Sequence, residues 1–309
     1  MSTIFKYNDS IIGIRSNIQR CVYDYNNYIL VLVKDIISKN NLSINVILDG
    51  DITLIDINNN KTIKLAINYE HTLVKEGGRS VAKNTPMGNI KTDENNNYLV
   101  RIDRYSQLNS SNIIIDYSNP NIFNVKECGV YSDFSNKHIY IAPTLYENLY
   151  IEIENRNIDS LTTFINTNEP RRKELLEKIS ESTLNHRNVN NCFEKSKIKE
   201  LYQNTKVVIN IHQTPHHHTF EELRCLPALQ NGVIVISEKS PLNNLIPYNE
   251  LIIWSDYNNI IDKTKEVLEN YEEFHKKIFK EENIKILKKM NDENKIELEK
   301  KIMNYISEE

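Results

Sequence analysis

The chain has 309 residues and a mass of 36.2 kDa, which is enough for two domains of ordinary size. Hydrophobic residues make up 39% of it and charged residues 26%, a composition typical of a globular protein with a sizeable core. The formal net charge of −4 excludes a uniformly basic surface, so nucleic acid is not an expected partner.

Membrane insertion and secretion are also disfavoured by the sequence. No apolar run has the length of a membrane span, and the N-terminus lacks the charged and apolar regions of a secretory signal. The 4 cysteines lie far apart without a CxxC pair, so neither a zinc site nor a disulfide framework is predicted. Reduced thiols in a cytoplasmic protein are the expectation.

Residues 1–150 are predicted to form a first α/β domain. Apolar residues at helical spacing, among them Tyr28, Leu32 and Ile36, predict a helix over 24–40. The polar segment 69–97 is predicted to be a long loop with little regular structure. β-rich runs between turn signals predict strands at 43–48, 52–57, 62–67, 113–115 and 139–141.

Residues 151–275 alternate between strands and helices and are predicted to form a second domain. Such alternation is typical of a parallel sheet with helices on both faces. A charged helical tail is predicted over 276–309. Strands are expected at 161–165, near 189, and at 207–211, 233–236 and 251–254, with helices at 170–180, 193–202, 219–230 and 257–268.

The segment 206–241 carries the most chemical information. A buried strand leads to a polar loop, after which Thr219 and Glu222 stand at the spacing of a capping box, with Thr219 as N-cap. A helix N-terminus at the carboxyl edge of a parallel sheet suits a diphosphate. His216 and His218 in the loop and Arg224 in the helix are expected to donate to phosphate oxygens. A metal cluster of adjacent histidines is disfavoured, because neighbouring residues in one loop cannot easily face a single ion.

A second strand follows the stop signal Asn231-Gly232 and ends at Ser237-Glu238. A carboxylate at that end of a strand is placed to accept hydrogen bonds from ribose hydroxyls, as acidic residues do in other Rossmann-like folds. Glu238 is therefore the predicted ribose ligand.

This stretch resembles the C-terminal domain of glycosyltransferases with two facing Rossmann-like domains, the GT-B architecture. It is most similar to the spore-maturation-protein-like branch, in which a strand, a polar loop, a Thr-Phe-Glu helix start, a glycine and a strand ending in Ser-Glu recur. Here the helix start is Thr219-Phe220-Glu221 and the glycine is Gly232. The strand Thr162-Thr163-Phe164-Ile165 and the helix start at Glu169-Pro170 fit the same plan, so the resemblance covers about 160–270.

The resemblance implies an α/β fold with two Rossmann-like domains facing across a cleft. It implies a glycosyltransferase that moves a sugar from a nucleoside diphosphate sugar, with UDP favoured, to a glycan or another hydroxyl acceptor. No permanently bound cofactor and no metal are expected. The residues expected at the donor are His216, His218, Thr219, Phe220, Glu222, Arg224 and Glu238.

One departure keeps other functions open. Retaining members of this architecture carry two glutamates before the glycine, and the matching positions here are Thr219 and Pro227. Glu221 or Glu222 is an alternative for the first of them. A nucleotide-sugar epimerase of the same architecture and a non-catalytic glycan- or nucleotide-binding module therefore remain alternatives.

An inverting transferase needs a general base beside the acceptor hydroxyl. Glu70 and His71 follow a predicted strand of the first domain and precede a glycine-containing loop, which makes them the first candidates. Asp103, Arg104 and Asp116 are weaker ones.

Overall fold

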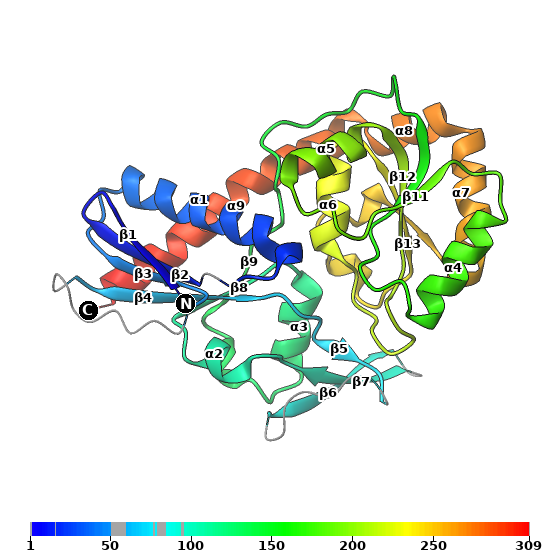
Figure 1. Ribbon diagram of the computed structural model, residues 1–309. Helices are drawn as coiled ribbons and strands as arrows, with labels where there is room; N and C mark the ends of the chain where they lie inside the picture. The colour runs from blue at the N-terminus through cyan, green and yellow to red at the C-terminus, as the bar shows by residue number, and fades with distance from the viewer. Residues whose placement is uncertain are drawn as a thin grey trace.

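The computed structural model describes residues 2–15, 17–50, 60–76, 78, 85–93 and 96–308. Two α/β domains, each centred on a largely parallel sheet, lie beside one another (Figure 1). The predicted α/β fold with two Rossmann-like domains is therefore confirmed, while the exact boundary near residue 150 stays a prediction. Within the described residues, no helix has both the length and the apolar character needed to cross a bilayer.

The sheet of the first domain contains an antiparallel hairpin followed by parallel strands. The hairpin pairs the first two strands, and every later neighbour in the sheet is parallel. The carboxyl ends of the parallel strands therefore share one edge, which faces the second domain. In sheet order the strands are β1 (Ser2–Tyr7), β2 (Ser10–Arg15), β3 (Asn45–Leu48), β4 (Thr62–Asn68), β8 (Ile113–Asp116) and β9 (His138–Tyr140).

Both faces of this sheet are buried. Ile113 and Ile115 point into a core shared with α1 (Tyr23–Lys39), whereas Ile114 between them points into a core with α3 (Asn119–Glu127). Burial on both faces explains why the strands read as continuous apolar runs in the sequence. The second of these cores also includes residues of α2 (Tyr105–Asn109).

The segment 69–97 is not the long loop that its polarity predicts. It contributes to a small antiparallel sheet in the order β5 (Leu73–Val74), β7 (Asn96–Arg101) and β6 (Met87–Asp93). Tyr98 and Val100, two residues apart on one face of β7, pack into the core below the main sheet. Their burial stabilises strands within an otherwise polar stretch. The predicted strand 52–57 lies outside the described residues.

The sheet of the second domain is entirely parallel, in the order β11-β10-β12-β13-β14. The chain leaves β10 toward β11 and then returns to the other side of β10, so the strand order reverses between β10 and β12. Ligands of open α/β sheets bind at such a switch point, outside the carboxyl ends of the strands. The strands are β10 (Ile158–Thr162), β11 (His186–Asn188), β12 (Thr205–Asn210), β13 (Ile234–Glu238) and β14 (Ile252–Ser255).

Helices connect these strands close to where the periodicity predicts them. The helices are α4 (Pro170–Ser180), α5 (Lys195–Gln203), α6 (Glu222–Gln230), α7 (Ile260–Glu269) and α8 (Tyr271–Ile278). Short 3-10 helices lie at Arg20–Val22, Ser132–Phe134, Asn243–Leu245, Asn249–Leu251 and Tyr257–Asn259.

The last helix, α9 (Glu281–Ser307), joins the two domains (Figure 1). Its first half packs Leu287 and Met290 into the core of the second domain. Its second half packs Leu298 and Ile302 into the core of the first domain, beside α1. The predicted helical tail is therefore a shared structural element of both domains.

Candidate functional site

A cavity of about 300 Å³ lies between the two domains. Tyr69, Glu70 and His71 line it from the segment that follows β4. Thr163 and Gln213, just beyond β10 and β12, line it from the second domain, which places the cavity at the switch point of the second sheet. We call this cavity the cleft; its size lies at the lower end of the range for small-molecule sites.

His71 and Glu221 connect the two walls of the cleft. The Nε2 atom of His71 lies 3.5 Å from the Oε2 atom of Glu221, and its Nδ1 atom lies 3.3 Å from the Tyr117 hydroxyl. Burial alone disfavours the charge of Glu221. The interactions with His71 and the charges of Arg224 and Arg172 prevail, and they lower the pKa of Glu221 to about 2. A fixed negative charge therefore stands in the cleft.

Two arginines of the second domain flank the aromatic ring of Phe164. The guanidinium of Arg172 lies 4.9 Å from the ring centroid and that of Arg224 lies 5.7 Å from it. Arg224 lines the cleft and donates to the side-chain oxygen of Asn210 at 2.7 Å. Burial, followed by the charge of Arg224, lowers the pKa of Arg172 to about 10. Two cations this close create a site that favours an anion.

Arg172 was not among the sequence candidates. Its position after the proline that starts α4 was visible in the sequence, but its proximity to Arg224 depends on packing across the sheet. The arginine pair is the main feature of the site that sequence reasoning missed.

Glu238 lies at the carboxyl end of β13, where the sequence predicts it. Its Oε1 atom accepts a hydrogen bond from Arg171 at 2.6 Å, and its Oε2 atom accepts one from the backbone N–H of His212 at 2.9 Å. These contacts fix the carboxylate at the edge of the sheet. Its contact with a ribose stays a prediction.

The helix start differs from the predicted capping box. Helix α6 begins at Glu222, residue Glu221 takes the N-cap position, and no side chain caps the helix. Phe220 packs on Trp254 with ring centroids 5.1 Å apart, which holds the preceding segment in an irregular conformation. The hydroxyl of Thr219 is consequently buried without a hydrogen-bond partner, so the capping role assigned to Thr219 is wrong.

Glu222 and Phe220 do not face the cleft. Glu222 is fully buried, and its Oε2 atom accepts hydrogen bonds from Tyr140 at 3.0 Å and Tyr248 at 2.8 Å. Burial raises its pKa to about 8. The ligand contacts expected of both residues are corrected accordingly: Phe220 belongs to the core of the second domain, and Glu222 belongs to the contact between the domains.

The histidine loop joins the small sheet of the first domain rather than standing open for phosphate. The carbonyl oxygen of His216 accepts a hydrogen bond from the N–H of Lys75 at 2.8 Å. The Nδ1 atom of His216 donates a hydrogen bond to the carbonyl of Glu76. The His218 Nε2 atom donates to the Pro215 carbonyl at 2.8 Å, which leaves Nδ1 to accept from the Tyr98 hydroxyl at 3.0 Å. We call this contact the histidine clasp; because it occupies these ring nitrogens, the phosphate role expected of His216 and His218 is not supported.

The described residues contain no group of three or more His, Cys, Asp and Glu side chains arranged to hold a metal ion.

The fold and the cleft together define a two-domain α/β protein with a candidate small-molecule site between its domains. The chain belongs to the same family as the uncharacterized protein R358 of Acanthamoeba polyphaga mimivirus. The two are 30% identical over 220 residues, which cover 67% of this chain and 74% of the relative. No protein-family profile matches the chain. Among solved structures, it is similar to the crystal structure of TarM, with a TM-score of 0.45 and 10% identity; the match covers 89% of this chain and 58% of TarM.

Proposed function

We propose that the protein transfers a glycosyl group from a nucleoside diphosphate sugar to a hydroxyl acceptor. The donor diphosphate lies against the second domain at the switch point, and the acceptor lies against the first domain. UDP is the favoured nucleotide, as the resemblance of 160–270 to GT-B glycosyltransferases implies.

The observation that carries this proposal is the pair Arg172 and Arg224 around Phe164. Arg172 is only 6% exposed, and its pKa is lowered by burial and by its neighbour's charge. The carboxylate of Glu221 offsets part of the charge of the two cations, and a bound anion compensates the positive charge that remains. Arginine presents planar donor groups that match phosphate oxygens, so a diphosphate at this edge of the sheet fits the arrangement.

The chemistry of transfer then follows from the two walls of the cleft. The acceptor hydroxyl oxygen attacks the anomeric carbon of the donor, and the bond from that carbon to the phosphate oxygen breaks. The electron pair leaves with the diphosphate, whose developing charge Arg172 and Arg224 stabilise. The hydroxyl proton passes to a general base on the first domain.

Glu70 is the better candidate for that base. His71 has a carboxylate of Glu221 beside one ring nitrogen and a hydroxyl beside the other, so its ring is already engaged. The hydrogen bonds of Glu70 with Asn68 and Asn121 use its backbone N–H and carbonyl. These bonds do not involve its carboxylate, and we propose that the carboxylate accepts the proton of the acceptor hydroxyl.

Calorimetric titration with UDP, GDP, CMP and dTDP tests the donor site. We expect one nucleotide to bind, and Arg172→Gln and Arg224→Gln each to weaken it about tenfold or more, a loss of roughly 1.4 kcal/mol. Arg187→Gln is the matched control, because Arg187 is exposed on β11 and does not line the cleft. Its affinity should equal that of the unaltered protein.

Absence of binding to every nucleotide would overturn the proposal. If a nucleotide sugar binds, release of nucleoside diphosphate that requires an added hydroxyl acceptor supports transfer. Conversion of the donor sugar without any acceptor would instead identify an epimerase, and binding without turnover of any donor would identify a non-catalytic module.

A further inference from the structure

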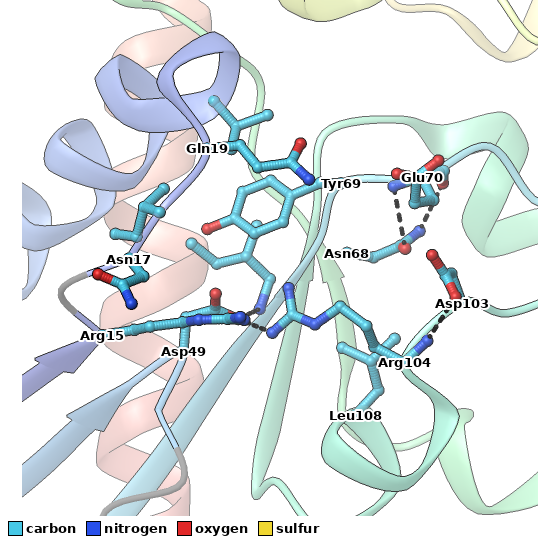
Figure 2. A pocket seen from close by; sticks show the side chains of 13 residues that line it. Arg15, Asn17, Gln19, Asp49, Asn68, Tyr69, Glu70, Asp103, Arg104 and Leu108 are labelled. Atoms are coloured by element: carbon cyan, nitrogen blue, oxygen red, sulfur yellow. Dashed lines mark hydrogen bonds and ion pairs between the residues drawn. The ribbon is translucent and has the colours of Figure 1, made fainter. Parts of the chain in front are cut away.

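A second and smaller cavity, of about 120 Å³, lies in the first domain next to the cleft. It is formed at the carboxyl ends of β2, β3 and β4 and closed by the residues that precede α2 (Figure 2). Polar and apolar side chains share its wall, and the polar ones include Arg15, Asn68, Asp103 and Arg104. We call it the side cavity.

An ion pair between Asp49 and Arg104 forms the floor of the side cavity. The Arg104 guanidinium donates to Asp49 Oδ1 at 2.6 Å and to the Gln107 side chain at 2.9 Å, and it lies 5.6 Å from the ring centroid of Tyr69. Both members of the pair have left-handed backbones, with φ of 52° at Asp49 and 56° at Arg104. Such conformations are costly outside glycine and are concentrated at functional sites.

The charges around the side cavity do not favour an anion. Arg15 and Arg104 bring two positive charges, whereas Asp49, Glu70 and Asp103 bring three negative ones. A phosphate or carboxylate would therefore meet a net negative wall. Within the described part of the chain, these carboxylates do not form a group of three or more ligands that could hold a metal ion.

The same wall suits a neutral ring with several hydroxyl groups. Carboxylates accept hydrogen bonds and guanidinium groups donate them, so adjacent hydroxyls find matched partners at Asp103 and Arg15. The amide nitrogen of Asn68 already donates to Asp116 at 2.8 Å and to the carbonyl of Glu70 at 3.1 Å, which fixes the side chain in advance. Its oxygen accepts from the Glu70 N–H and has a second lone pair for a ring hydroxyl. The volume of about 120 Å³ is below the roughly 150 Å³ of a cavity that holds a benzene ring, so the side cavity takes one edge of a sugar ring, the rest of which extends toward the cleft, and it excludes a nucleotide.

The side cavity also has the right position relative to the reaction. Tyr69, Glu70, Gln19 and Val22 line both the side cavity and the cleft, so the two spaces share a wall. A ring in the side cavity would therefore present its outer hydroxyl to Glu70 at the border of the cleft. That border is where a glycosyl acceptor must meet its donor.

We propose that the side cavity binds a neutral sugar ring of the acceptor, so that the protein extends a carbohydrate. This inference rests on the proposed function, and it assigns Arg15, Asn68, Asp103 and the Asp49–Arg104 pair to acceptor recognition. The ring is held by hydrogen bonds between its hydroxyls and these side chains.

Saturation-transfer NMR with a panel of glucose, galactose, mannose, N-acetylglucosamine and rhamnose tests the inference on the full chain, with and without UDP. We expect at least one sugar to bind, and Arg15→Gln and Asp103→Asn each to weaken it about tenfold. Both positions are at least partly exposed, so the variants should keep the melting temperature of the unaltered protein. Asp133→Asn is the matched control, since Asp133 is exposed in a 3-10 helix outside both cavities.

Three results would overturn the inference. The first is UDP binding without binding of any sugar, which leaves the proposed function in place but removes the carbohydrate acceptor. The second is competition of inorganic phosphate for the sugar site, which identifies an anion site. The third is a loss of sugar affinity in Asp133→Asn equal to that in Arg15→Gln and Asp103→Asn. Failure of the proposed function is distinguished from all three because none of UDP, GDP, CMP and dTDP would then bind.

Discussion

The Nε2 atom of His71 and the Oε2 atom of Glu221 lie 3.5 Å apart, and they belong to different domains. The Tyr117 hydroxyl on the other ring nitrogen holds the imidazole in place. The relative position of the domains is therefore fixed in part by the contact between His71 and Glu221 inside the cleft, near the arginines proposed to bind the donor.

Glu221→Gln should make the protein less sensitive to acid. The folded-state pKa of Glu221, about 2, lies below its ordinary value of 4.5, so its contribution to stability is present above pH 4.5 and is lost as the pH falls toward 2. In the variant, the free energy of unfolding measured by urea titration at pH 3 and pH 6 should differ less than in the unaltered protein. Glu177→Gln, in an exposed ion pair with Lys173, is the control; an equal effect there would contradict the assignment.

Glu222→Gln should remove a loss of stability that occurs as the pH rises above about 4.5. Burial raises the pKa of Glu222 from 4.5 to about 8, so the unfolded chain ionises first and stability falls as the pH rises from about 4.5 to 8. The amide keeps the shape of the side chain without its charge. Between pH 5 and pH 8.5, we expect the free energy of unfolding of the unaltered protein to fall by roughly 2–4 kcal/mol more than that of the variant. Urea unfolding at both values measures this, and the exposed Glu250→Gln should show no such gain.

Gly232→Ala should destabilise the second domain. Gly232 has φ of +66°, and an added Cβ would lie 2.6 Å from the carbonyl oxygen of Tyr150 and 2.8 Å from the Arg156 guanidinium. We expect a loss of about 3 kcal/mol, which combines backbone strain and overlap. Gly129→Ala isolates the strain, because φ is +71° there and nothing lies within 4 Å of the new atom. Thermal unfolding that ranks the two variants equally would show that the overlap is relieved without cost.

Tyr98→Phe should loosen the histidine clasp. The change removes the hydroxyl that faces His218 Nδ1 at 3.0 Å while keeping the buried ring. Loss of one such bond costs about 1 kcal/mol, so amide hydrogen exchange in 213–219 should accelerate roughly fivefold. The half-exposed Tyr23→Phe is the control. Unchanged exchange in the first variant would argue that the backbone contacts alone hold the clasp.

The regular elements of the second domain were predictable because their determinants are local. The apolar run Val207–Ile209 lies in β12, and Pro170 starts α4 at the predicted residue. Gly232 ends a helix in the left-handed conformation that the stop signal predicts. The pattern of apolar residues and turn signals alone is sufficient for such elements.

The errors concern contacts between residues far apart in sequence. Glu222 has the spacing of a capping residue, yet two tyrosines from other parts of the chain enclose its carboxylate, and no local pattern contains that information. The small sheet pairs short polar strands whose stability comes from Tyr98 and Val100 beneath it. The polar loop before the helix start predicts phosphate contacts for His216 and His218, but this loop pairs with the small sheet instead.

Because α9 contributes Leu298 and Ile302 to the first core and Leu287 and Met290 to the second, the first domain is not a contiguous piece of the chain, and the second ends within α9. A fragment ending near residue 150 would expose the surface that α9 covers, and a fragment starting there would carry the detached half of that helix into solvent. To study the domains separately, residues 295–307 must be supplied to the first domain, either fused through a linker or added as a peptide.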